Sequence, residues 1–297
     1  MAQRIETTPR PLPVTSRRAL LSPGALDRSR LPLTYVVLIL FSVMILFPFL
    51  WLILASLKDM NQYMAIPLQW LPNPAHWDNY SAIFTVYNFG RYAFNSVWLA
   101  LYSVVVATLS SAVVAYGFAR LKFRGRNLLF GLVLATMLLP AQALTISLFI
   151  LFKDLGWYGT FLPIIVPKLF GSAFDIFLMR QFFLGLPREI DEAARLDGCG
   201  NWRIFWRMIL PQATPILIVV AIFEFLNSWK DTWGPLVYLT DDANRTLPLG
   251  LLNFTTPFGP DYPKLMAATA VALIVPVILY AFGQRYIDRG VVIADLK

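Results

Sequence analysis

Residues 187–211, PREIDEAARLDGCGNWRIFWRMILP, form a polar interruption with apolar segments on both sides. The proline that opens the stretch suits the first turn of a helix, and acidic residues follow it at once. Negative charge is favourable there because the N-terminal end of a helix carries a partial positive charge. The pattern predicts a helix that begins near Pro187 and carries Glu189, Asp191 and Glu192 in its first turns.

One face of this predicted helix is apolar and narrow. Ile190, Ala193 and Ala194 are spaced by three and four residues, which places them on the same side. The alanine side chains are small, so the helix backbone can approach another surface closely. The sequence therefore predicts that this face lies in a groove of a partner.

The end of the helix is marked by two glycines. Gly198 and Gly200 break it, because glycine readily adopts the left-handed conformation found just after helices. Asn201 can cap a second helix, which is expected to end at Pro211. We therefore expect two short helices joined by a glycine-rich turn.

The order of residues within this stretch resembles a known motif. Glu-Ala-Ala at 192–194 is followed by glycine at 198 and by Leu-Pro at 210–211. This spacing is similar to the EAA loop of ABC-importer permeases. Met208 stands where that family usually has isoleucine, which is a change between apolar side chains of similar volume. An ordinary loop helix is the alternative, but it would not require glycine and Leu-Pro at fixed offsets.

The resemblance implies that residues 187–211 are a cytoplasmic coupling loop whose helix docks into a cleft of an ATPase subunit. The residues implied for this contact are Glu189, Ile190, Glu192, Ala193, Ala194, Asp197 and Gly198. The sequence has no G-x-x-x-x-G-K-[ST] motif to hold ATP phosphates. Any ATP-driven work therefore needs a partner ATPase, and we expect the chain to be a transporter subunit rather than an enzyme.

Composition indicates a polytopic membrane protein. Hydrophobic residues make up 58% of the chain and charged residues 14%, and the mean hydropathy is positive. The net charge of +8 comes largely from short basic clusters between apolar spans, where Lys and Arg set orientation, so we expect no nucleic-acid binding. One cysteine and one histidine exclude a disulfide framework and a cysteine-rich zinc site within one chain. We expect no metal and no cofactor.

Apolar runs predict an all-α fold with six transmembrane helices. The predicted spans lie at about residues 33–56, 92–118, 128–152, 161–179, 212–225 and 265–284. The expected organisation is a flexible basic cytoplasmic tail at 1–31, a permease domain at 32–290 with an external loop at 57–91 and the coupling loop at 187–211, and a C-terminal cytoplasmic tail at 291–297. Pro140 lies inside the third span and marks either a kink or the transport path.

Positive charge orients these spans. Eighteen of the 25 Lys and Arg residues lie in segments assigned to the inner side, as the positive-inside rule predicts. Acidic residues divide almost evenly between the two sides, which agrees with a rule that counts only positive charge. We expect a multi-pass protein of a bacterial or archaeal cell membrane with both termini in the cytoplasm.

The resemblance extends over roughly residues 33–297. Within this range the sequence is similar to the carbohydrate-uptake, maltose-permease-like branch of the family. The segments that carry it are DIFLMRQFF at 175–183, FLNSWKDTWGP at 225–235, TLP at 246–248, MAA at 266–268 and QRY at 284–286. It implies sugar import through a lipid membrane with a second homologous permease, two ATPase subunits and an extracytoplasmic sugar-binding protein. Asp175, where many relatives carry asparagine, and a tail without the usual glycine-bearing ending depart from that branch.

Charged residues inside predicted spans are costly in lipid and are candidates for function. Lys168 and Asp175 are seven residues apart on one helix face, so structural ion pairing and a role in transport are equal alternatives. Carboxylates and amides bind sugar hydroxyls, and an aromatic ring covers the C–H face of a sugar. The expected sugar path is lined by Glu224, Asn227, Trp229, Asp231 and Asp175. For Trp229, anchoring at the membrane interface is the alternative.

A polytopic membrane enzyme, such as a lipid-linked glycosyl transferase, is the alternative from another class. It would use Glu224, Asp231 or Asp175 as an acid or base. It explains neither the spacing within residues 187–211 nor the scarcity of polar clusters at one membrane face. The importer permease is therefore the preferred interpretation.

Overall fold

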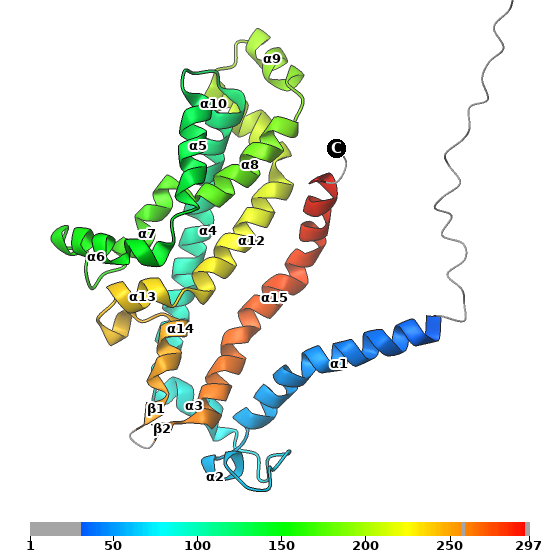
Figure 1. Cartoon of the computed structure of the whole chain (residues 1–297), viewed down its shortest axis with the longest axis vertical. Coiled ribbons are helices and arrows are strands. Elements are labelled where there is room, and N and C mark those ends of the chain that lie inside the picture. Colours follow the sequence, from blue (N-terminus) through cyan, green and yellow to red (C-terminus); the bar gives the residue numbers. More distant parts are fainter. Residues whose placement is uncertain (1–30, 257–258, 295–297) are drawn as a thin grey trace, which may run out of the picture. The chain divides into compact units, whose positions relative to one another are not determined.

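The computed structural model describes residues 31–256 and 259–294, which are mainly helical (Figure 1). The expected N-terminal tail lies outside the described residues except for Leu31, and so do residues 295–297 of the expected C-terminal tail. The elements in chain order are α1 (Leu31–Ser56), α2 (Met60–Tyr63), α3 (Asp78–Thr85), α4 (Phe89–Arg120), α5 (Arg126–Thr136), η1 (Ala141–Leu144), α6 (Thr145–Asp154), α7 (Leu162–Ile165), η2 (Pro167–Phe170), α8 (Ala173–Gly185), α9 (Glu189–Leu196), α10 (Asn201–Ile204), η3 (Phe205–Ile209), α11 (Leu210–Gln212), α12 (Thr214–Lys230), α13 (Trp233–Tyr238), η4 (Asp242–Asn244), α14 (Leu247–Gly250), η5 (Leu251–Asn253), β1 (Thr255–Thr256), β2 (Gly259–Pro260) and α15 (Tyr262–Ala294). β1 and β2 pair antiparallel, with Thr255 opposite Pro260.

The chain divides into two units, residues 1–51 and 52–297, which are described separately. Helix α1 belongs largely to the first unit and continues through Pro48. Its side chains from residue 34 to residue 50 are exposed and almost all apolar. A helix that faces lipid on every side has this composition, since no water is available to polar groups in the membrane core. The first predicted span agrees with this helix within two residues at its start.

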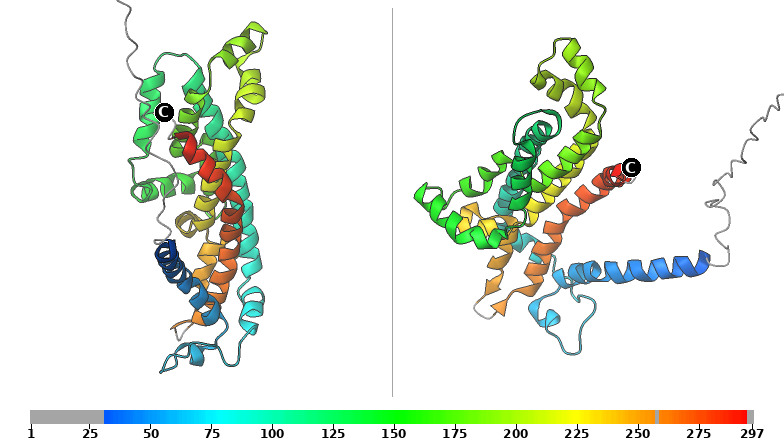
Figure 2. Two further views of the ribbon diagram at one scale, coloured as in Figure 1. Left: turned by 90° about the vertical axis from the view of Figure 1, so that its right-hand side faces the viewer. Right: turned by 45° about the horizontal axis from the view of Figure 1, so that its top comes forward.

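Helix α4 packs along both α8 and α12 in the second unit (Figures 1 and 2). Small side chains recur on its buried side every four residues, at Ser103, Ala107, Ser111 and Ala115. Small residues let neighbouring backbones come close together. Gly171, between η2 and α8, lies so close to α4 that a Cβ atom added to it would be 2.8 Å from Ser111 Oγ. The φ of this glycine is +76°, a conformation that also disfavours any other residue. Small side chains on α4 thus allow its neighbours to pack closely against it.

The third predicted span is not one helix. α5 ends at Thr136, η1 forms a 3-10 turn, and α6 begins at Thr145. Pro140 causes the break, because it cannot donate a backbone hydrogen bond and disfavours helical geometry in the residue before it. The proline therefore interrupts the predicted span instead of only kinking it.

Among the described residues, four helical runs are long and apolar enough to cross a membrane: 34–56, 89–120, 162–185 and 262–284. A fifth span results if residues 201–212 and 214–230 count as one helix bent by 80°. The bend lies at Ala213, between Pro211 and Pro215. The apolar helix α5 is shorter. These elements are compatible with six predicted spans, of which the third is broken and the fifth is bent.

Residues 57–91 are folded around α2 and α3. The Asn79 amide donates hydrogen bonds to the carbonyl of Ser56 at 2.9 Å and to that of Lys58 at 2.8 Å. Lys58 is fully buried, and its ammonium group donates to the Gln69 carbonyl. These contacts tie the segment to the end of α1, and its external position stays a prediction.

Candidate functional site

The predicted coupling helix is α9, at one end of the second unit (Figure 1). Glu189, Asp191 and Glu192 occupy its first turn, where negative charge is stabilised by the helix dipole. The helix begins two residues after the predicted position, and Arg188 precedes its first residue. The acidic start predicted from the sequence is confirmed.

One arginine holds α9 against the end of α4. Arg120 Nη1 donates to Asp191 Oδ2 at 2.7 Å, and Arg120 Nη2 donates to the Leu186 carbonyl at 2.8 Å. The side chains of Arg120 and Asp191 are only 3% and 9% exposed. Breaking a buried pair of this kind typically costs about 3–5 kcal/mol, because the remaining charge is left uncompensated. The pair therefore fixes the position of α9 relative to the membrane-spanning helices.

The apolar face predicted for α9 is divided in the structure. Ala194 is buried within its own chain, in the cluster that contains Ile204 and Phe205. Ala193 is exposed and Ile190 is half-buried. Ala194 is covered by residues of its own chain in this structure, and the shared surface of the three residues toward a partner stays a prediction. The surface that α9 leaves open carries Glu189, Glu192, Ala193 and Leu196.

The exit from α9 has the geometry that glycine permits. Gly198 has a φ of +77°, in the left-handed region, and its amide donates to the Arg195 carbonyl at 3.0 Å. The amide of Cys199 donates to the Ala194 carbonyl at 2.9 Å. These bonds satisfy carbonyls at the end of the helix, and the left-handed turn predicted at Gly198 is confirmed.

Asn201 does not cap the second helix. Gly200 is the capping residue, in an extended conformation, and Asn201 is the first residue of α10. The side-chain oxygen of Asn201 instead accepts from Arg195 Nη2 at 3.4 Å, and its carbonyl accepts from Tyr116 Oη at 3.3 Å. The correction has a physical cause: glycine fits the extended cap position, and Asn201 is used to tie the turn to α9 and α4.

A second polar cluster lies inside the membrane-spanning part, where three charged residues meet. Lys168 Nζ contacts Glu224 Oε2 at 2.8 Å. Asp175 lies within electrostatic range of both residues and is 1% exposed. Its Oδ2 has no hydrogen-bond partner among the described residues. The pairing of Lys168, which the sequence left open, is therefore with Glu224, and Asp175 is an additional buried carboxylate beside that pair.

The remaining residues of the predicted sugar path are not brought together. Asn227 is exposed on α12, whereas Trp229 is buried, stacks on Phe225 at 5.6 Å and donates from Nε1 to the Ala272 carbonyl at 3.2 Å. Asp231 Oδ1 accepts from the Gly234 amide at 3.1 Å, at the start of α13. Trp229 therefore joins α12 to α15 in this conformation, and the path assignment stays a prediction.

Comparison with known proteins gives the family. The model of the binding-protein-dependent transport system inner membrane component family matches residues 107–293. The chain belongs to this family. The matched region contains α9, the buried charges and the bent fifth span of this permease.

The permease is similar to sugar-transport permeases over most of its length. It is 37% identical over 254 residues to the arabinooligosaccharides transport system permease protein AraQ of Halalkalibacterium halodurans, which covers 84% of this chain and 91% of the relative. It is 32% identical over 268 residues to the diacetylchitobiose uptake system permease protein NgcG of Streptomyces coelicolor, covering 89% and 88%. A solved bacterial ABC transporter involved in alginate import aligns with a TM-score of 0.75 at 22% identity, over 88% of this chain and 98% of that one, and shows the same fold.

Membership in this family settles the class of protein. The permease is the membrane component of an ABC importer, and ATP hydrolysis belongs to an ATPase partner. A substrate-binding protein is the other partner that the family implies. The alternative of a lipid-linked glycosyl transferase is wrong, because the relatives are transport permeases.

Proposed function

We propose that this permease is one of two homologous membrane subunits of an importer that moves an oligosaccharide or a related glycoside into the cytoplasm by alternating access. The observation that carries the proposal is the anchored position of α9: a short helix with an open acidic and apolar surface is fixed to α4 by a buried ion pair. The sugar class is supported by the relatives, which are named for arabinooligosaccharides and diacetylchitobiose.

The coupling contact is proposed for the open surface of α9 and its exit. Glu189, Ile190, Glu192 and Ala193 would contact an ATPase, and Asp197 and Gly198 would set the direction in which the chain leaves. Ala194 takes a positioning role, since it packs inside the permease. In this arrangement, movement of the ATPase is transmitted through Arg120 to α4.

The orientation and stoichiometry complete the proposal. We place α9 and both termini in the cytoplasm and residues 57–91 outside, since the basic residues cluster on the α9 side. Two permeases would be driven by two ATPases and supplied by an external sugar-binding protein. Residues 1–31 and 291–297 would be cytoplasmic tails of the permease domain at 32–290.

Affinity purification from native bacterial membranes tests the assembly. A tagged permease should bring down an ATPase, a second and different permease, and a sugar-binding protein with its ligand. Recovery of the ATPase with two copies of this same chain would contradict the paired-permease proposal. Recovery without any ATPase would contradict the importer assembly as a whole.

Gly198→Pro should lower sugar uptake by roughly ten-fold or more in the reconstituted importer, because incompatible backbone geometry costs about 1–3 kcal/mol or more. Proline fixes φ near −65° and removes the amide that bonds to Arg195. Gly198→Ala is the control: its Cβ meets no atom within 4 Å, so it should cost only about 1 kcal/mol from the left-handed φ. Equal uptake by Gly198→Pro and the wild type would show that coupling does not need the turn at Gly198.

Asn227→Ala should weaken uptake several-fold without abolishing it, because losing one hydrogen bond to a sugar costs about 1 kcal/mol. The exposed position of Asn227 on α12 leaves its amide available to a substrate. The measurement is the dependence of uptake on sugar concentration, with Gln212→Ala as an exposed control across the bend. Identical curves for Asn227→Ala and the wild type would exclude Asn227 from the path.

A further inference from the structure

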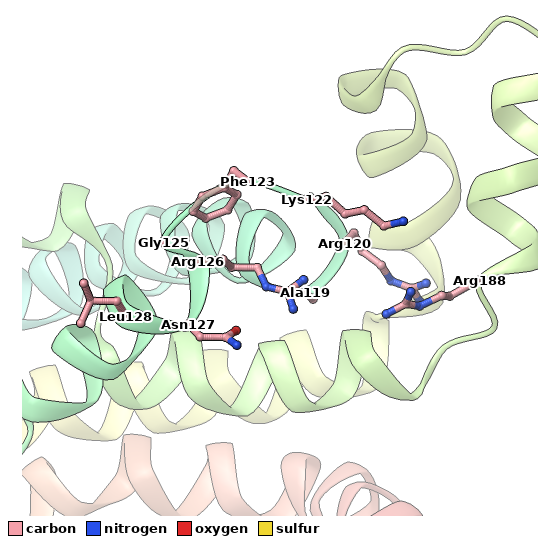
Figure 3. Close-up of a pocket in the computed structure, with 9 residues that line it drawn as sticks. All are labelled: Ala119, Arg120, Lys122, Phe123, Gly125, Arg126, Asn127, Leu128 and Arg188. Carbon is pink, nitrogen blue, oxygen red and sulfur yellow. The ribbon is translucent and has the colours of Figure 1, made fainter.

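A basic pocket of about 420 Å³ lies beside the loop that joins α4 to α5 (Figure 3). Four of its lining side chains are cationic: Arg120, Lys122, Arg126 and Arg188. Within the described part of the chain, no carboxylate lines it. A pocket of this charge is suited to an anion.

The positive charge of the pocket is only partly neutralised by the permease itself. Asp191 pairs with Arg120. Lys122, Arg126 and Arg188 form no ion pair with any residue that the structure describes. Arg126 also lies within electrostatic range of another cation, Arg180. An anion in the pocket would relieve this repulsion.

The start of α5, where backbone amides lack partners within the helix, also lines the pocket. Gly125 immediately precedes α5, has a φ of +82° and provides no side-chain cap, and its carbonyl accepts from the Leu129 amide. The amides of the first turn of an α-helix lack partners within the helix, and its dipole favours an anion. Independently, Arg120 Nε in the pocket wall is buried without a hydrogen-bond partner among the described residues.

An apolar surface continues from the pocket along α5. Leu128 at the pocket is 71% exposed, and Leu132 one turn further is 56% exposed. Because α4 spans the membrane and ends at Arg120, the pocket lies where the hydrocarbon region gives way to the headgroups. Cations at the headgroup level above an apolar strip match a phospholipid, whereas a soluble anion would use only the cations.

We propose that this pocket binds the phosphate group of an anionic phospholipid, whose acyl chains lie along the exposed leucines of α5. Lys122, Arg126 and Arg188 supply the charge, and the first turn of α5 supplies amide donors. The same pocket is bounded by Arg120, the residue that holds α9. A bound lipid therefore stiffens the loop on which the coupling helix rests.

The test is lipid retention by the importer complex purified in detergent, measured by native mass spectrometry after exposure to phosphatidylglycerol or phosphatidylcholine. The wild type should retain phosphatidylglycerol in preference. Lys122→Gln, Arg126→Gln and Arg188→Gln should each reduce retention by roughly five-fold. Arg124→Gln is the matched control, because this arginine lies in the same loop but does not line the pocket, and it should retain the lipid as the wild type does.

Several outcomes would overturn the proposal. Equal retention of the two lipids, or an equal loss in Arg124→Gln, would show that the pocket does not select the anionic headgroup. Complete displacement of phosphatidylglycerol by inorganic phosphate would identify a soluble-anion site instead. Release of another subunit by Arg188→Gln with unchanged lipid retention would assign the pocket to a protein partner. Arg126→Lys keeps the charge and should retain the lipid; a loss equal to that of Arg126→Gln would contradict a site based on charge.

Discussion

Arg120→Leu should reduce sugar uptake by about 100-fold or more while the ATPases retain their basal hydrolysis. The substitution leaves Asp191 buried without its partner, which typically costs about 3–5 kcal/mol, and it frees the Leu186 carbonyl that Arg120 holds. α9 would then lose its fixed position against α4. Sugar uptake by proteoliposomes, and their ATP hydrolysis measured in the absence of sugar, test the two expected results.

A double-mutant cycle separates the ion pair from other effects. Arg120→Leu combined with Asp191→Leu leaves no unpaired charge, so it should recover a large part of the stability lost in either single variant. Arg124→Leu, an exposed arginine of the neighbouring loop, serves as the control and should behave as the wild type. Wild-type coupling in Arg120→Leu would show that α9 does not depend on this anchor.

Lys168→Met should destabilise the permease by about 3–5 kcal/mol, because it leaves the buried carboxylate of Glu224 without its cation. The effect is increased by Asp175, which lies beside Glu224 and is also buried. Thermal unfolding of the detergent-purified complex should shift to lower temperature, and uptake should fall with it. Lys153→Met, which removes a lysine from the end of α6, is the control for loss of positive charge.

Combining Lys168→Met with Glu224→Gln tells stability apart from transport. The double variant carries no unpaired charge at either position and should regain most of the thermal stability. If Glu224 contacts the sugar, uptake should stay low even though the protein is stable. Full recovery of both properties would assign the Lys168–Glu224 pair to structure alone, and unchanged stability in Lys168→Met would contradict the pair itself.

Local chemistry explains which parts of the fold the sequence predicts. The acidic start of α9, the left-handed Gly198 and a departure from regular helix at Pro140 each depend on residues within a few positions of one another. Helix dipoles, positive φ and the missing proline donor act at that range. Apolar runs likewise predict membrane spans, although they do not show that the third is broken.

Local chemistry does not predict which residues far apart in the chain contact one another. Arg120 and Asp191 are separated by 71 residues, and Lys168 and Glu224 by 56. Each of these residues has an ordinary local explanation, as a loop cation, a helix-start acid or an intramembrane charge. Only the packing of α9 against α4, and of η2 against α12, shows which of them meet. The contact of Trp229 with α15 could not be predicted for the same reason, since α15 follows more than 30 residues later.

The 80° bend at Ala213 has a mechanical consequence. It makes residues 201–230 an elbow: the short arm, α10 to α11, adjoins the coupling helix, and the long arm, α12, carries Glu224. If the bend keeps its angle, a displacement of α10 to α11 parallel to the membrane surface tilts α12. We therefore expect a sideways displacement of the ATPases to change the separation of Glu224 from Lys168, so that the fixed bend beside two prolines sets how far the buried charges part in each transport cycle.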